Sequence, residues 1–202
     1  VDGVLTDGSI VYGNSGTVTL STPVTASSIT FGQSNYLITG STITLTNSGI
    51  VSAVNMQTNN GVQIDSVVAG SVGVTKNGPG VLTLGNGANT YTGPTVLNCG
   101  SLFFGADGRI PNSSSVTANP GTELILQAAV RNLSGRLGVV PVTLRDAFLR
   151  ITGSLNSSSV DTIGTLNIAQ GHSILYFHSE TSLIGLNTLA IVAAPGSALQ
   201  IS

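Results

Sequence analysis

The only lysine and the only cysteine of the chain lie in one stretch, on either side of two glycine clusters. Residues 73–102 read GVTKNGPGVLTLGNGANTYTGPTVLNCGSL and contain Lys76 and Cys99. A lysine near glycines is typical of a phosphate-binding loop, in which the lysine follows the glycines. Here Lys76 precedes them, and no helix signal follows to hold a pyrophosphate. We therefore predict that these glycines form corners of the chain and bind no nucleotide.

The remaining titratable residues form no clear catalytic constellation. His172 and His178 are six positions apart, so on one strand they would lie ~20 Å apart, too far for one metal ion. His178 and Glu180 could together contact a cation, but we favour a solvated turn for them. The densest charged cluster is Asp146 with Arg145 and Arg150, and the alternative to an active site there is a solvated corner.

Composition excludes two classes of partner. Charged residues are only 7% of the 202 residues, the net charge is −2, and the cations are scattered. Nucleic-acid binding requires clustered Lys and Arg, so we expect no nucleic-acid partner. Apolar runs are far shorter than the ~20 residues that span a bilayer, so we expect no membrane span. No catalytic, cofactor-binding or metal-binding residue is assigned.

Short strands separated by turn residues are predicted along the whole chain. Residues that favour helices are scarce, and apolar and polar residues alternate with a period of two. Residues 124–137 suit a strand followed by a loop at least as well as a helix. The predicted strands are 9–13, 17–20, 28–31, 41–46, 61–65, 80–84, 94–98, 101–104, 122–127, 148–153, 162–169, 173–177, 188–192 and 197–202.

A weak internal repeat favours a β-solenoid. A glycine turn followed by alternating aliphatic residues recurs at 40–49, 78–87, 98–108, 119–127 and 194–202. In a parallel β-helix, inward aliphatic residues stack from coil to coil and the corners need Gly or Asn. We predict an all-β parallel β-helix in which residues 1–202 form one elongated module, with about twenty residues in each coil. An antiparallel sandwich is the alternative.

The stretch 73–102 resembles the autotransporter-associated β-strand repeat, also called the passenger-associated transport repeat. The matching positions are Lys76, Gly78, Gly80, Leu82, Thr83, Leu84, Asn89, Tyr91, Gly93, Thr95, Val96, Gly100 and Leu102. The resemblance implies a right-handed parallel β-helix that is secreted or displayed on a bacterial cell surface, with no catalytic residue or cofactor. Leu82, Leu84, Val96 and Leu102 are expected to point inward, and Tyr91 is expected to cap a corner.

Three functions remain open at this point. The first is a structural stalk, fibre or surface-layer module that is a fragment or repeat subunit of a larger surface protein and contacts copies of itself end to end or neighbouring repeats. The second is an adhesin with a host or glycan surface as partner. The third is a polysaccharide-cleaving enzyme, which requires the carboxylates of Asp146, Asp161 and Glu180 to converge.

Three further residues carry expectations about exposure. Cys99 is expected to be a small buried hydrophobe, with a reactive thiol or an intermolecular disulfide as the alternative. Phe103 and Phe104 are adjacent, so on a strand one of them must point outward, either to a partner surface or under a neighbouring loop.

Overall fold

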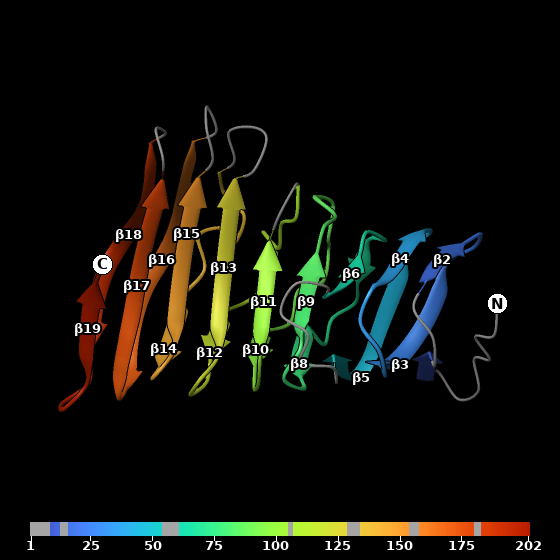
Figure 1. Ribbon diagram of the computed structural model, residues 1–202, viewed down its shortest axis with the longest axis horizontal. Coiled ribbons are helices and arrows are strands. Elements are labelled where there is room, and N and C mark those ends of the chain that lie inside the picture. Colours follow the sequence, from blue (N-terminus) through green and yellow to red (C-terminus); the bar gives the residue numbers. More distant parts are fainter. Residues whose placement is uncertain are drawn as a thin grey trace.

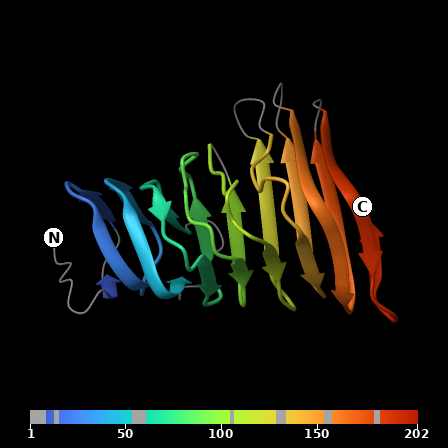
Figure 2. The ribbon, with the colours of Figure 1, turned by 180° about the vertical axis from the view of Figure 1, so that it is seen from behind.

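The structure, a computed structural model, describes residues 9–12, 16–53, 61–104, 107–128, 134–153, 158–179 and 183–202. All regular elements in these ranges are β-strands, and every strand pair is parallel. Two sheets face each other and run the length of the molecule, as opposite views of it show (Figures 1 and 2). The predicted parallel β-helix is confirmed, and the antiparallel sandwich is wrong.

The chain alternates between the two sheets, so each coil adds one strand to both. We call the first of them sheet A. Its main path is β1 (Ser9–Tyr12), β3 (Val24–Phe31), β5 (Ile43–Ala53), β8 (Val74–Asn77), β10 (Thr95–Leu97), β12 (Val116–Ala118), β14 (Val142–Arg145), β16 (Ser159–Gln170) and β18 (Ile184–Ala193), and β7 (Val68–Ala69) pairs with β5 off this path.

The second sheet, sheet B, takes the strand that follows in each coil. It consists of β2 (Gly16–Leu20), β4 (Tyr36–Gly40), β6 (Val62–Ile64), β9 (Val81–Leu84), β11 (Ser101–Phe104), β13 (Glu123–Ala128), β15 (Phe148–Gly153), β17 (His172–Ser179) and β19 (Ala198–Ile201). Because each strand pairs with the strand of the next coil, β2 and β19 lie at opposite ends of the long axis (Figure 1).

The inward face of sheet B is an aliphatic ladder. Leu82 pairs with Leu102, Leu102 with Leu124, Leu124 with Leu149, and Leu149 with Leu175. These leucines are all buried, and each contributes roughly 1.5–3 kcal/mol by leaving water. Successive partners are 20, 22, 25 and 26 residues apart, so the coils lengthen from β9 to β17.

The stretch 73–102 forms one coil and both of its corners. Gly78 and Gly100 have φ of +77° and +68°, values that residues other than glycine rarely adopt. A Cβ on Gly100 would also lie 2.5 Å from the backbone oxygen of Gly80 in the preceding coil. The expected role of these glycines as corners is confirmed.

Three of the four expected core positions in this stretch are correct. Leu82, Leu84 and Leu102 are fully buried. Val96 instead lies half-buried on the outer face of β10, because Thr95 and Leu97 on either side of it point inward. The described residues contain no helix that could cross a membrane.

Candidate functional site

Lys76 is a corner residue of the solenoid interior. Its side chain points inward from β8 and is fully buried. Its Nζ donates hydrogen bonds to three backbone oxygens, those of Asn77 at 3.0 Å, Gly78 at 2.6 Å and Cys99 at 3.0 Å. Burial lowers the pKa of Lys76 from 10.5 to about 8, against a smaller opposing effect of Cys99. The ammonium therefore joins the corners of two successive coils.

Asn89 and Tyr91 of the same stretch are also buried and hydrogen-bonded within the protein. Asn89 accepts from the Val68 backbone N at 2.8 Å and donates to the backbone oxygens of Asn86 and Arg109. The Tyr91 hydroxyl contacts Thr95 Oγ1 at 2.8 Å, so its partner is a buried side chain. Burial raises the pKa of Tyr91 well above its usual value.

Thr95 links Tyr91 to the next coil. Its Oγ1 lies 2.9 Å from Ser113 Oγ, which donates to the backbone oxygens of Gly93 and Ser115. This hydroxyl network requires Thr95 to point inward, which is why Val96 beside it points outward. The polar residues of the repeat thus satisfy buried backbone groups and join coils.

Cys99 does not fill the buried position expected for it. Its side chain is exposed, while its backbone oxygen accepts from Lys76. The position directly follows Asn98, and Asn98 belongs to an exposed ladder of amides at the end of sheet A strands. Asn98 donates to Asn77 Oδ1 at 2.9 Å and accepts from Asn119 Nδ2 at 2.8 Å. The amide side chains of Asn77, Asn98 and Asn119 therefore form one hydrogen-bonded row along this corner over three successive coils.

The densest charged cluster of the sequence is divided between an exposed corner and an ion pair. Arg150 pairs with Glu123 of the preceding coil at 2.6 Å, while Asp146 is an exposed corner residue with φ of +52°. Asp146 Oδ1 accepts from the His172 backbone N at 3.2 Å. Asp161 is fully buried in an ion pair, so it cannot join Asp146 in a solvent-filled cleft. Glu180 lies outside the described residues.

The partner of Asp161 is Arg136, a residue that the sequence did not single out. Asp161 Oδ2 lies 2.6 Å from the Arg136 guanidinium, and Oδ1 accepts from the Arg136 backbone N at 2.8 Å. The guanidinium also contacts Ser159 Oγ and the Phe104 backbone oxygen. Arg136 and Asp161 are 25 residues apart, which is the length of one coil here. Pairing the two charges from the sequence therefore requires knowledge of the coil length.

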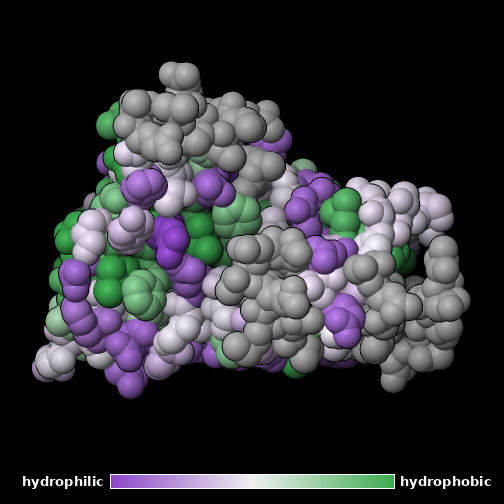
Figure 3. Space-filling model, viewed as in Figure 1, coloured by the Kyte–Doolittle hydropathy of each residue, from purple (hydrophilic) through white to green (hydrophobic). Residues whose placement is uncertain are grey.

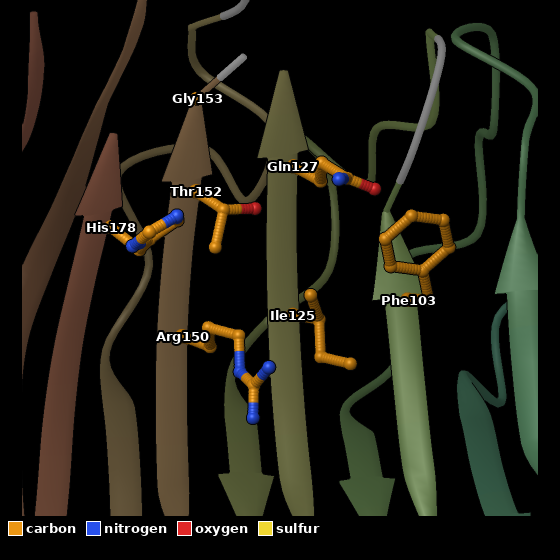
Figure 4. Close-up of a pocket in the computed structure, with 7 residues that line it drawn as sticks. All are labelled: Phe103, Ile125, Gln127, Arg150, Thr152, Gly153 and His178. Carbon is orange, nitrogen blue, oxygen red and sulfur yellow. The ribbon is translucent and has the colours of Figure 1, made fainter. Parts of the chain in front are cut away.

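A groove on the outer face of sheet B is the candidate functional site. It encloses about 380 Å³ and crosses four neighbouring strands. Figure 4 shows side chains from all four around the same hollow, and Figure 3 shows green and purple surface side by side on this face. The lining residues are Phe103 of β11, Ile125 and Gln127 of β13, Arg150, Thr152 and Gly153 of β15, and His178 of β17.

The register of the sheet explains why these residues meet. Phe103 pairs with Ile125, Ile125 with Arg150, and Arg150 with Tyr176, so one outward row crosses the four strands. The Arg150 guanidinium carbon lies 5.5 Å from the centre of the Tyr176 ring, within the range of a cation–π contact. His178 stacks on the same tyrosine, with ring centres 6.3 Å apart.

The groove brings together residues that lie far apart in the sequence. Phe103 is the outward member of the Phe103–Phe104 pair, and Phe104 is fully buried, as strand alternation requires. His172 and His178 occupy one strand, and His178 lines the groove. No three His, Cys, Asp or Glu residues gather as a metal site within the part of the chain that the structure describes.

Comparison with known proteins identifies the class of the repeat. The family model for the passenger-associated-transport-repeat matches residues 74–102, the coil built around Lys76 and Tyr91. The chain therefore carries a passenger-associated transport repeat, and the resemblance noted in the sequence is confirmed.

A similarity to one named protein extends beyond the repeat. The chain is 30% identical over 210 residues to the adhesin BmaC autotransporter of Brucella suis biovar 1 (strain 1330). That alignment covers 94% of this chain and 6% of the relative, so the chain spans a small part of the length of the protein it matches. No solved structure matches. The repeat and the relative indicate a secreted protein of the cell surface, as expected.

Proposed function

We propose that the chain is one noncatalytic segment of a longer β-solenoid shaft on the bacterial surface. The observation that supports this most is that the polar side chains of the repeat, those of Lys76, Asn89 and Tyr91, form their hydrogen bonds inside the fold. Asp161 is likewise committed to Arg136. Such an interior stabilises stacked coils and leaves these groups no access to a substrate.

The C-terminal coil has the surface that a shaft segment needs for its next neighbour. Ile191 and Ile201 are 52% and 64% exposed, although the residues they pair with, Leu166 and Leu175, are buried. Each extends an inward ladder by one step, and β18 and β19 are the last strands of their sheets. We infer that a neighbouring coil of a longer chain covers this face, and that in isolation a second copy does so.

Small-angle X-ray scattering of the purified chain at increasing concentration tests this shaft model. At ~4.8 Å per coil the nine layers give a rod of about 40 Å, and end-to-end contact should lengthen it stepwise as concentration rises. A double variant with Ile191→Asn and Ile201→Asn should remain one rod long. Thr143→Asn on the outer face of β14 is the control. A particle whose length never changes with concentration would contradict end-to-end stacking.

Adhesion is a second candidate function, favoured by the groove on sheet B. The similar Brucella suis protein is named an adhesin, and the groove places apolar and polar side chains on an outer face of the shaft. We propose that this face attaches to a host surface. Beads coated with the chain should adhere to cultured host cells, and a Phe103→Ala variant should adhere less. Equal adhesion by the variant would remove the groove from this role.

A further inference from the structure

We propose that the groove on sheet B binds a neutral oligosaccharide that lies across β11, β13, β15 and β17. The proposal rests on the second candidate function, adhesion, and names the class of ligand. Four strands at ~4.8 Å spacing give the row from Phe103 to Tyr176 a length of about 14 Å, enough for a short saccharide chain.

One end of the groove offers an apolar platform. Phe103 and Ile125 are paired neighbours on the outer face, and both side chains are only partly buried. In Figure 4 the face of the Phe103 ring is turned toward the viewer, away from the sheet. The electron-rich face of an aromatic ring attracts weakly positive hydrogens, and the C–H groups on one side of a pyranose ring supply these. A sugar ring can therefore stack on Phe103.

The other side of the groove offers hydrogen-bonding groups. Gln127 pairs with Thr152, which pairs with His178, in a second outward row beside the first. The side chains of Gln127 and Thr152 hydrogen-bond to no other residue that the structure describes. An amide and a hydroxyl each both donate and accept, which matches sugar hydroxyls that also do both.

The charge of the groove favours a neutral ligand. The lining contains a single arginine, Arg150, and Glu123 pairs with it at 2.6 Å. The two side chains are 45% and 23% exposed, so the pair lies at the surface and remains balanced. An acidic polysaccharide would need clustered cations to displace its counterions. The groove contains no such cluster, while the guanidinium can still donate to neutral oxygens.

The backbone of the sheet argues against a peptide as the ligand. Peptides commonly bind a sheet by adding a strand to an open edge, where main-chain hydrogen bonds provide the affinity. The four strands of the groove each have a partner on both sides, so their backbone groups are already paired. Recognition in the groove must use side chains, and Phe103, Gln127, Thr152 and Arg150 are suited to a ligand rich in hydroxyl groups.

The test uses the purified chain on a printed array of neutral and sialylated oligosaccharides, with saturation-transfer NMR on each neutral oligosaccharide that binds. Phe103→Leu and Gln127→Leu should each weaken binding at least about tenfold, equivalent to ~1.4 kcal/mol. Gln63→Leu is the matched control, because Gln63 lies on the outer face of the same sheet, on β6, outside the groove. The melting temperatures of the groove variants should stay near that of the parent chain, since both residues point outward.

The outcomes separate this inference from adhesion itself. Binding of neutral oligosaccharides that Phe103→Leu and Gln127→Leu weaken, and Gln63→Leu does not, supports the proposal. Attachment of coated beads to cells without binding to any neutral oligosaccharide overturns the ligand class and leaves adhesion standing, with a protein as the partner. Preference for sialylated oligosaccharides also overturns it. If coated beads do not attach to cells and the chain binds no oligosaccharide, adhesion is overturned as well.

Discussion

Replacing Lys76 with methionine keeps the aliphatic stem in the solenoid interior and removes the ammonium from the corner. Three backbone oxygens lose a hydrogen bond, and two of them, on Asn77 and Gly78, belong to the same turn. At ~1 kcal/mol for each acceptor left without its partner, the loss is about 3 kcal/mol. Methionine also lacks the desolvation cost that the buried ammonium carries, which reduces the net effect to about 2 kcal/mol or slightly more.

Thermal unfolding followed by circular dichroism measures this loss. For a chain of this size, 2 kcal/mol lowers the melting temperature by roughly 4–8 °C. Thr75→Ala is the control, because Thr75 is the preceding residue on β8 and lies half-buried on its outer face. That variant should melt within about 2 °C of the parent. A Lys76→Met variant as stable as Thr75→Ala would refute the role of Lys76 as a link between coils.

The pH dependence provides an independent check of the same residue. The folded pKa of Lys76 is about 8 and the ordinary value is 10.5, so between these pH values the unfolded chain binds more protons. Stability therefore rises with pH across this window, by at most ~1.4 kcal/mol per pH unit. From pH 7.5 to 9.5 the parent chain should gain stability relative to Lys76→Met. A constant difference between the two proteins would show that Lys76 is not desolvated.

Three further substitutions test other parts of the interior. Leu84→Ala should cost about 2–5 kcal/mol in urea unfolding, since Leu84 is fully buried, and an unchanged midpoint would remove it from the core. Tyr91→Phe should abolish a fall in stability above pH 10, because the raised pKa of Tyr91 makes the folded chain hold a proton that the unfolded chain releases. Arg136→Met should cost about 3–5 kcal/mol, and adding Asp161→Leu should restore part of it, because the lone buried carboxylate is then removed.

Local sequence predicted the strands well because alternation is a local property. Leu82, Leu84 and Leu102 were placed correctly, since side chains of a strand alternate between its two faces. Val96 was placed wrongly because hydrophobicity favours it over Thr95 for an inward position. The hydroxyl network of Tyr91, Thr95 and Ser113 reverses that preference, and its members come from two coils.

Contacts between coils were beyond local reasoning. Lysine is almost never fully buried, so nothing in the sequence around Lys76 indicates an inward side chain. The ion pair of Arg136 with Asp161 and the groove both depend on the number of residues in each coil. That number changes along the chain, so a fixed repeat of twenty residues cannot align Phe103 with Arg150 and Tyr176. The groove is a property of the register and not of any one segment.

The lengthening of the coils has a mechanical consequence. Each coil contacts mainly its neighbours, so a molecule pulled by its two ends should unwind one coil at a time from an end. The released length depends on the coil, from 20 residues between Leu82 and Leu102 to 26 between Leu149 and Leu175. At ~3.3–3.6 Å per extended residue, successive force peaks would lie roughly 66–94 Å apart. The spacing of the peaks would thus record which end of the rod yields first under load.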